Sequence, residues 1–262
     1  MSIFSLHDKD EIEAFLRRNV FLHIYTIGDL DDFFWPYTTW YARKAGDQIE
    51  QVALLYTAPT PPVLLALSEE PLDGMRELLR SLMHLLPARF YAHLSGDLAS
   101  VFAADYRVES HGEHYKMALT NPALLETVDT SEVIALSGAD LGALEDLYQA
   151  SYPGNWFDPR MLETGQYYGV RRGAELVSVA GVHVYSPCYR VAALGNITTR
   201  PELRGSGLGT AVTARLCKAL LRTVDHIGLN VKADNASAIA SYTRLGFERI
   251  GSYEECMVEL KR

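Results

Sequence analysis

The sequence predicts an α/β protein in which helices flank a mixed central sheet, and two observations support this fold class. Apolar runs of strand length alternate along the chain with segments whose apolar residues recur at helical spacing. Turn-forming residues such as Gly173 and Pro187 separate these segments. With 262 residues, the chain can form one large domain or two of ordinary size.

The C-terminal half predicts a clear series of elements. A short strand and an amphipathic helix come first, three strands follow in close succession, and helix and strand then alternate. We expect strands at 133–136, 167–170, 176–185, 191–199 and 225–231, helices at 140–150, from 208 and from 236, and a final pair of strands within 249–259.

The N-terminal half repeats this rhythm less clearly, with helices at 8–18 and 72–85, a hairpin of strands at 49–56 and 63–67, and strands at 90–94 and 115–119. The segment 121–127 resembles a linker, so we expect an N-terminal domain of residues 1–126 and a C-terminal domain of residues 127–262. From the pattern alone, the first domain is either a degenerate copy of the second or an unrelated α+β cap.

Composition and charge exclude several classes of protein. Hydrophobic residues make up 48% of the chain and charged residues 22%, which is typical of a soluble globular protein, and no apolar run is long enough to span a membrane. The net charge of −9 arises before residue 130, where 19 acidic residues outnumber 10 basic ones, and this disfavours nucleic acid as a partner. Cys188, Cys217 and Cys256 are far apart, which argues against a metal site and favours a reducing, cytoplasmic location.

A glycine-rich loop between a strand and a helix gives the strongest functional signal. Arg204-Gly205-Ser206-Gly207-Leu208-Gly209-Thr210 follows the strand 191–199, and an amphipathic helix begins within it. Glycines let backbone N–H groups turn toward a ligand, and a helix N-terminus adds unpaired donors and partial positive charge. The loop is therefore a candidate pyrophosphate-binding site, with Arg200 and Arg204 beside it.

Several interpretations of this loop compete. A nucleotide P-loop needs Lys-Ser or Lys-Thr after the glycines, and neither is present. A dinucleotide-binding turn needs Gly-x-Gly-x-x-Gly directly after the strand, whereas here the glycines alternate and residues 201–204 intervene. Two interpretations stay open: the loop binds coenzyme A, as the family resemblance described below implies, or it binds no ligand.

A second motif favours coenzyme A. Asn235 stands where a short helix is expected to begin, and Tyr242 follows seven residues later, just before Leu245-Gly246-Phe247. In this order, the loop and this segment resemble the two signatures of the Gcn5-related N-acetyltransferase superfamily. The stretch 194–204 is most similar to the branch of FR47-like proteins and glycine N-acyltransferase. The resemblance implies the acetyltransferase fold, and similarity to tandem acetyltransferases implies two copies of it.

The resemblance also implies a cofactor, acetyl-coenzyme A or another acyl-coenzyme A, and the residues that hold it. Tyr242 would act near the sulfur atom as general acid, although from the residues alone it could equally be a buried helix tyrosine. Asn235 would hold the pantetheine arm, or serve only as a helix N-cap. No metal is expected. The implied cofactor-binding residues are Ile197, Thr198, Thr199, Arg204, Gly205, Ser206, Gly207, Leu208, Gly209, Thr210, Asn235 and Tyr242.

The acceptor side is less determined by the sequence. The candidate general bases are unranked: Asp158, Glu163, His183 and Glu202. Four aromatic residues could line an acceptor pocket or belong to the core: Trp156, Phe157, Tyr185 and Tyr189. Because Asp29, Asp31 and Asp32 lie in an acidic N-terminal half, we expect a cationic or zwitterionic acceptor that enters at the junction of the halves.

Two functions remain open. The first is an acyl-coenzyme A-dependent N-acyltransferase that acts on a small amine, an amino acid or a peptide. The second is a non-catalytic sensor or binding module for acyl-coenzyme A. Tyr242 favours the enzyme, because a sensor does not need an acid near the sulfur atom.

Overall fold

The computed structural model describes residues 3–261 and divides the chain into two compact units. Unit 1 contains the chain up to Lys116, Lys232–Asp234 and the segment from Ile250 onward, and unit 2 contains Met117–Val231 and Asn235–Arg249. We had expected two consecutive domains that meet at residues 126 and 127. Instead, two long strands, β6 (Tyr106–Leu119) and β12 (Phe247–Leu260), each contribute residues to both units.

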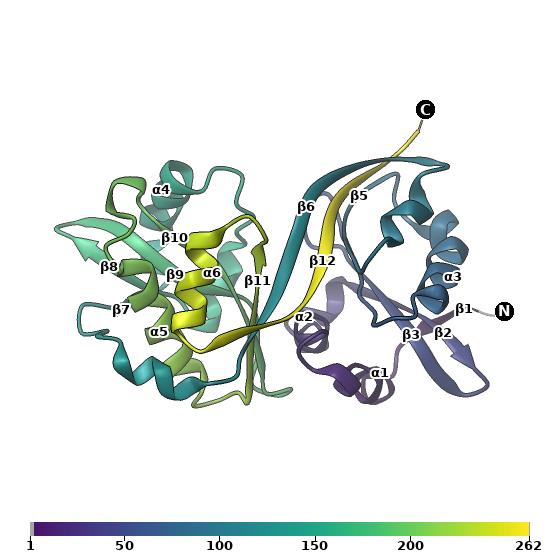
Figure 1. Ribbon diagram of the computed structural model, residues 1–262, viewed down its shortest axis with the longest axis horizontal. Helices are drawn as coiled ribbons and strands as arrows, with labels where there is room; N and C mark the ends of the chain where they lie inside the picture. Colours follow the sequence, from purple (N-terminus) through teal and green to yellow (C-terminus); the bar gives the residue numbers. More distant parts are fainter. Residues whose placement is uncertain (1–2, 262) are drawn as a thin grey trace. The chain divides into compact units, whose positions relative to one another are not determined.

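Unit 2 is built on a mixed sheet with the strand order β11-β10-β9-β8-β7. β10 and β11 are parallel, and the other neighbouring strands are antiparallel. Helices α4 and α5 pack on this sheet, and α6 lies beside α5 (Figure 1). The elements are β7 (Ile134–Ala135), α4 (Leu141–Ser151), β8 (Tyr168–Arg172), β9 (Glu175–Ser186), β10 (Val191–Thr199), α5 (Leu208–Leu220), β11 (His226–Lys232) and α6 (Ala236–Arg244).

Unit 1 has the strand order β1-β2-β3-β4-β5-β12-β6, in which β4 and β5 are parallel. Helix α3 packs on this sheet and buries Met75, Leu78, Leu79 and Leu82, which share one helical face. The elements are β1 (Ile3–Leu6), α1 (Lys9–Leu16), α2 (Ile24–Gly28), β2 (Thr38–Ala45), β3 (Gln48–Tyr56), β4 (Val63–Ala66), α3 (Asp73–Leu82) and β5 (Arg89–Leu94), followed by β6 and the second part of β12.

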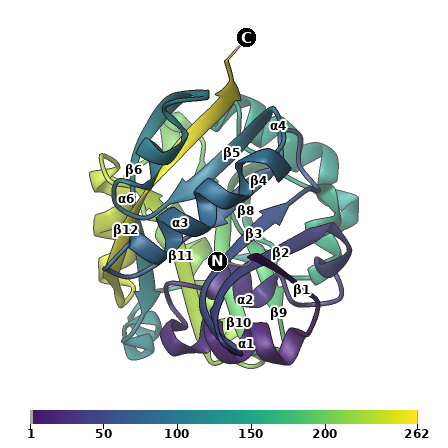
Figure 2. The same cartoon turned by 90° about the vertical axis from the view of Figure 1, so that its right-hand side faces the viewer.

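The C-terminal strand differs from the prediction. We had expected a pair of strands within 249–259, but Phe247–Leu260 is one strand, and Gly251 lies within it without forming a turn. Its residues 254–259 pair antiparallel with β5, and Figure 2 shows β12 between β5 and β6. Cys256 and Val258 face the core under α3. Tyr253 and Glu255 occupy alternate positions, so they lie on the other face of the sheet.

Each unit contains a parallel pair of strands joined by a helix: β4, α3 and β5 in unit 1, and β10, α5 and β11 in unit 2. Four residues of each strand are in register in both pairs. The predicted fold class, a mixed sheet flanked by helices with two similar copies, is therefore confirmed. In such folds, ligands bind beyond the carboxyl ends of the parallel strands, which is where the glycine-rich loop of unit 2 lies.

Candidate active site

The glycine-rich loop leads from β10 into α5. Gly205 and Gly207 have φ angles of +78° and +87°, which strain any residue with a Cβ atom, and α5 begins at Leu208. Within the described part of the chain, no acceptor bonds to the backbone N–H groups of residues 205–210. These consecutive donors stand at the positive end of a helix dipole, so the loop is suited to a phosphate or pyrophosphate group.

The arginines beside the loop hold the backbone in place. The Arg204 guanidinium group donates to the carbonyl oxygens of Thr199 and Ser151, at 3.3 and 2.9 Å, and so ties the loop to the ends of β10 and α4. Arg200 forms an ion pair with Glu175. These contacts are with the protein itself, and a contact of Arg200 and Arg204 with phosphate, expected from their place beside the loop, stays a prediction.

The polar side chains of the loop and of α5 make local contacts. The Ser206 hydroxyl donates to the Leu203 carbonyl at 2.5 Å. Leu208 and Gly209 form the first turn of α5, and a Cβ atom added to Gly209 would lie 3.3 Å from Thr199 Oγ1. Thr210 Oγ1 lies 2.6 Å from Ser241 Oγ, which joins α5 to α6 next to Tyr242. The loop, the end of β10 and α6 therefore meet in one region of unit 2.

The end of β10 is the second part of the site. β10 pairs with β11 only from Val191 to Leu194. β10 itself continues to Thr199 and stays paired with β9 on its other side. Ile197, Thr198 and Thr199 lie in this extension, and Thr198 is buried. An extended backbone that parts from one neighbour can bond an amide-containing ligand along that edge.

A β-bulge shapes this extension. Asn196 has a φ angle of +56°, and the register with β9 shifts between Gly195 and Thr198. Tyr148 of α4 donates to the Asn196 carbonyl at 3.1 Å, and the Asn196 amide donates to the Tyr167 hydroxyl at 2.9 Å. Burial raises the pKa of both tyrosines, so they stay protonated and act as fixed hydrogen-bond groups. Sequence reasoning missed this support, because it joins segments about 30 to 50 residues apart.

Tyr242 lies on α6 with its ring 6.0 Å from the Phe247 ring. Burial, with smaller contributions from Tyr152 and Cys217, raises its pKa above the usual value near 10, so the hydroxyl is protonated at neutral pH. Within residues 3–261, no side chain or backbone group bonds to this hydroxyl. A protonated phenol without a partner is chemically suited to donate a proton or a hydrogen bond to a ligand.

Asn235 is the N-cap of α6. Its side-chain oxygen accepts from the Ala238 N–H and the Ser237 hydroxyl, both at 3.2 Å. The cap uses only the oxygen, so the side-chain NH₂ group is available on an exposed surface. The N-cap role that the sequence predicted for Asn235 is therefore observed. This role leaves the NH₂ group able to contact a ligand.

Among the candidate bases, His183 has the most informative position. Its ring lies against Gly195, so closely that a Cβ atom on that residue would overlap it. The ring also stacks on Trp156, with 6.0 Å between centroids and 28° between planes. His183 is therefore held at the point where β10 leaves β11. Asp158, by contrast, caps a short 3₁₀ helix and pairs with Arg160 at 2.5 Å.

The aromatic candidates divide into two groups. Phe157 packs between Tyr148 and Tyr167, at centroid distances of 5.1 and 5.9 Å, so it supports the bulge. Tyr185 donates to Thr223 Oγ1 at 3.0 Å. Trp156 is 41% exposed and stands over His183. Of the predicted pocket residues, Trp156 has the position best suited to contact an acceptor.

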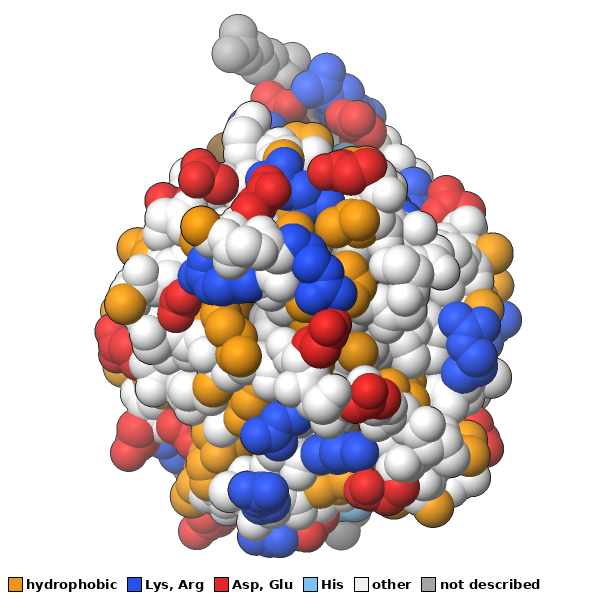
Figure 3. Space-filling view, turned by 90° about the vertical axis from the view of Figure 1, so that its left-hand side faces the viewer, with side chains coloured by type: hydrophobic (Ala, Val, Ile, Leu, Met, Phe, Trp, Pro, Cys, Tyr) orange, Lys and Arg blue, Asp and Glu red, His pale blue; other side chains and the backbone are white. Residues whose placement is uncertain are grey.

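The acidic segment of unit 1 is less exposed than its sequence suggested. Asp29 is buried, and burial raises its pKa to about 8, so it is largely neutral at pH 7. Asp32 pairs with Lys9 at 2.6 Å. In unit 2, the face shown in Figure 3 carries Lys and Arg side chains interspersed with Asp and Glu, in line with the balanced charge of the chain after residue 129. The attraction of a cationic acceptor remains a prediction.

The fold and the loop define the class: this chain has the fold of the Gcn5-related N-acetyltransferases, in a tandem arrangement. Residues 167–258, which include the glycine-rich loop, the end of β10 and α6, match the family described as FR47-like protein. A mycothiol acetyltransferase of Amycolatopsis mediterranei is 36% identical over 101 residues, which cover 36% of this chain and 32% of that protein. This chain thus matches about a third of the length of that relative.

Two solved structures show the fold over the whole chain. A Drosophila protein has a TM-score of 0.73 at 12% identity and covers 98% of each chain. A tandem GNAT protein from the clavulanic acid biosynthesis pathway has a TM-score of 0.56 at 16% identity, with 100% of this chain and 99% of that chain covered. Within the described residues, no helix is long and apolar enough to cross a bilayer. The same part of the chain contains no group of three or more residues suited to a metal ion.

Proposed function

We propose that this protein is an acyl-coenzyme A-dependent N-acyltransferase, with acetyl-coenzyme A as the expected donor and a small amine, amino acid or peptide as acceptor. The observation that carries the proposal is the row of unpartnered backbone N–H groups at residues 205–210, which adjoins the free edge of β10. Phosphate at the helix N-terminus and an amide-containing arm along the strand fit this combination. Acetyl-coenzyme A, when bound, supplies an activated acyl group as a thioester.

Tyr242 would donate a proton, or a hydrogen bond, to the sulfur atom of the leaving thiol. Its raised pKa keeps the phenol protonated, and the absence of a partner among the described residues leaves the proton available. Backbone N–H groups near the bulge at Asn196 would polarise the acyl carbonyl, since this backbone is fixed by Tyr148 and Tyr167. Asn235 would hold the arm of the cofactor through its free NH₂ group.

His183 would take the proton of the attacking amine. Its ring is fixed against Gly195 and under Trp156, beside the part of β10 where the acyl carbonyl would lie. A base in this place, with an acid near the sulfur atom, gives the proton transfers that aminolysis of a thioester needs. Trp156 would cover the acceptor and exclude water.

The test is calorimetric titration of the full chain with acetyl-coenzyme A, together with thiol release in the presence of a panel of small amines, amino acids and peptides. Gly207→Val should abolish binding, because valine is strained at this φ and its side chain would enter the open space in front of the loop. Gly173→Val is the matched control, since Gly173 has a φ of +60° in the turn between β8 and β9. Equal affinity in both variants would contradict the proposed loop.

The second candidate is a sensor that binds acyl-coenzyme A without turnover. The protonated Tyr242 hydroxyl favours the enzyme, because a binding module does not need an acid near the sulfur atom. One site per chain with no thiol release for any amine in the panel would favour the sensor.

A further inference from the structure

Buried polar atoms without a hydrogen-bond partner are concentrated in unit 2. Nearly all buried polar groups of native proteins are hydrogen-bonded, so each exception points to a missing partner or a special role. Within residues 3–261, five of the six such side-chain atoms lie at the end of α4, in the connection from α4 to β8, or at β10 and just after it. The five are Ser151 Oγ, Asn155 Nδ2, Gln166 Oε1, Asn196 Oδ1 and Arg200 Nε, and the sixth, Glu77 Oε2, lies in unit 1.

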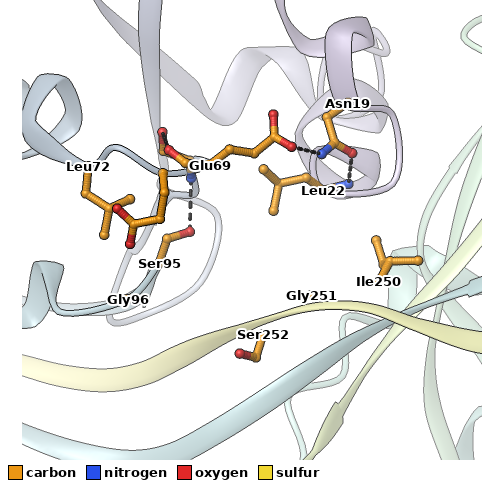
Figure 4. Close-up of a pocket in the computed structure, with 11 residues that line it drawn as sticks. Asn19, Leu22, Glu69, Leu72, Ser95, Gly96, Ile250, Gly251 and Ser252 are labelled. Atoms are coloured by element: carbon orange, nitrogen blue, oxygen red, sulfur yellow. Dashed lines mark hydrogen bonds between the residues drawn. The ribbon is translucent and has the colours of Figure 1, made fainter.

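Unit 1 offers a contrast in its cavity of ≈ 210 Å³ beside the start of α3, shown in Figure 4. Polar groups that line this cavity are bonded to one another: Asn19 donates to Glu69 at 2.9 Å, and the Ser68 N–H donates to Ser95 at 3.0 Å. None of the six unpartnered atoms belongs to a residue of the lining. The sign of a missing partner is therefore in unit 2.

Asn196 is the most deeply buried of the five residues, at 3% exposed, and it lies in the bulge of β10. Its Nδ2 donates to the Tyr167 hydroxyl at 2.9 Å, and this hydroxyl donates to the Val182 carbonyl at 3.1 Å. Because a carbonyl oxygen can only accept, the Tyr167 proton is used there, and the amide must present its NH₂ group to Tyr167. Asn196 Oδ1 is thus fixed as an acceptor without a donor, and the partner that it lacks carries an N–H or O–H bond.

The surroundings of Asn196 place this acceptor beside His183. Gly181 and Gly195 are directly paired, and a Cβ atom on either glycine would overlap a ring, that of Tyr167 on Gly181 and that of His183 on Gly195. Since paired residues point to the same face of a sheet, the two rings are neighbours on one face. Asn196 follows Gly195, and its bond to Tyr167 brings its amide to this face as well.

The connection from α4 to β8 covers this face. Trp156 stacks on the His183 ring, and Phe157 packs against Tyr167, at centroid distances of 6.0 and 5.9 Å. Asn155 and Gln166, with two more of the unpartnered atoms, belong to the same connection. A ligand that reaches Asn196 is therefore enclosed, and an unmet hydrogen bond there has a larger cost than in water.

The attacking nitrogen of an acyl acceptor meets this requirement only if it has two N–H bonds. It must keep its lone pair for the acyl carbon and give one proton to the base, so the bond to Asn196 needs a second N–H. A neutral primary amine has two N–H bonds. A secondary amine has one, and it would leave the buried acceptor unpaired.

We propose that Asn196 Oδ1 accepts a hydrogen bond from the attacking nitrogen and thereby selects primary amines as acceptors. The inference rests on the proposed function, in which His183 takes a proton from the same nitrogen. The nitrogen bonds to the acyl carbon as the carbon–sulfur bond breaks, His183 takes one proton, and Tyr242 supplies the proton of the leaving thiol. The N–H bond that faces Asn196 remains in the amide product.

The experiment measures kcat/KM of the full chain by thiol release from acetyl-coenzyme A, with glycinamide and its N-methyl derivative sarcosinamide. The two amines have similar basicity and differ by one N–H bond and one methyl group. Propylamine and N-methylpropylamine form a second pair. Asn196→Gly removes the side chain, and glycine adopts the φ of +56° without strain. Tyr148→Phe is the matched control, because it removes the bond to the Asn196 carbonyl at 3.1 Å and leaves the side-chain amide in place.

We expect the unmodified protein to prefer the primary amine of each pair by at least about 30-fold, since a site built around a substrate N–H strongly rejects an analogue without it. In Asn196→Gly, kcat/KM should fall by at least about tenfold for the primary amine and by about threefold or less for the secondary amine, which does not use this acceptor. Tyr148→Phe should lower both values by the same factor, because it acts only on the backbone of the bulge.

Equal kcat/KM for both amines in the unmodified protein would overturn the proposal, and so would a ratio that Asn196→Gly leaves unchanged, because a purely structural role lowers both values alike. With thiol release present, either result removes the role of Asn196 and leaves the proposed function standing. Absence of thiol release with every amine of the panel would remove the proposed function and this inference with it.

Discussion

The two places where a parallel strand leads into a helix have the same local topology and opposite chemistry. In unit 2, Gly205 and Gly207 turn the backbone, and the row of N–H groups at the N-terminus of α5 has no partner among residues 3–261. In unit 1, Glu69, Glu70 and Pro71 stand before α3, beside a cavity without basic residues. The fold provides the position beyond the strand ends, and the few residues of the connection decide which charge is accepted there.

The units also differ in where their titratable groups lie. Unit 1 buries a polar cluster on the face of the sheet opposite α3, in which Glu255 accepts from Tyr91 at 2.5 Å and from Tyr253 at 2.7 Å. Burial opposes the ionisation of Glu255, but His93, His114 and the two hydroxyls outweigh it and lower its pKa. Beside it, burial lowers the pKa of Lys116 to about 7. In unit 2, the buried groups near the loop are phenols that stay neutral.

Tyr242→Phe gives the largest expected effect on the proposed activity of unit 2. Turnover should fall by about 10² to 10⁴, the usual contribution of a general acid. The affinity for acetyl-coenzyme A and the melting temperature should change little, because the hydroxyl has no partner within the described residues. Steady-state kinetics with thiol detection measures the first quantity, and calorimetry and thermal unfolding measure the others.

Tyr152→Phe serves as the control, since Tyr152 is an exposed tyrosine of the same unit that influences the pKa of Tyr242. Near-normal turnover in Tyr242→Phe would assign the proton transfer to another group or to water. A pH profile adds a check: because the pKa of Tyr242 is raised, turnover should show no alkaline loss from this group below about pH 10.

Ser206→Glu places a carboxylate in the glycine-rich loop of unit 2, as Glu69 and Glu70 do before α3 in unit 1. Ser206 is exposed in the glycine-rich loop, and a carboxylate there would repel pyrophosphate as Glu69 and Glu70 are expected to do. We expect the Kd for acetyl-coenzyme A to rise by about 30- to 100-fold, and less at high salt, which screens exposed charges. Calorimetry at low and high salt tests this.

Ser206→Ala is the matched control, because it loses only the hydrogen bond to the Leu203 carbonyl and should weaken binding by threefold or less. If Ser206→Glu and Ser206→Ala had the same Kd, the charge of the loop would not decide its ligand, and the comparison between the units would fail at this point.

The sequence predicted the loop well, because glycine spacing and a helix start are local features: Gly205, Gly207 and the start of α5 at Leu208 lie as expected. The order of strands and helices in unit 2 was also predicted from apolar periodicity, whereas β1, α2 and β2 of unit 1 were not predicted. The structural role of Arg204 was not predicted, because one of its two acceptors, the Ser151 carbonyl, lies 53 residues away along the chain. Local spacing carries no signal for such a contact.

Two further features required the structure. We expected a pair of strands within 249–259, whereas β12 runs through this segment as one strand and pairs with β5, which is distant in the sequence. His183 could not be ranked above Asp158, Glu163 or Glu202, because its contact with Gly195 depends on the register of β9 and β10 and on the bulge between Gly195 and Thr198. The register of a strand depends on the strands that pair with it, and the sequence of one strand does not reveal those partners.

His183→Asn tests the acceptor side of the site with a smaller expected effect. Turnover with an alkylamine acceptor should fall by about 10- to 100-fold, because such an amine needs a base to lose its proton. With an acceptor that is neutral at the assay pH, such as hydroxylamine, the loss should be threefold or less. A structural role alone would lower both rates equally, so the ratio of the two rates separates the interpretations.

We expect the smallest effect from Asp29→Asn, which tests whether the buried carboxyl group of Asp29 lowers the stability of the protein. Burial raises the pKa of Asp29 to about 8, so the folded protein keeps the carboxyl protonated while the unfolded chain ionises it above about pH 4. Stability should therefore fall as the pH rises from about 4 to 8, and Asp29→Asn should remove this fall.

At pH 7.5 we expect the variant to be more stable by at least about 1.4 kcal/mol, the equivalent of one pKa unit, and at pH 4 the two proteins should be nearly equal. Urea unfolding at both pH values measures the difference, with Asp31→Asn, which changes another acid of the same segment, as the control. A variant that is less stable at pH 7.5 would show that the Asp29 carboxylate is ionised and stabilised in unit 1, and the buried acidity of this unit would then favour folding.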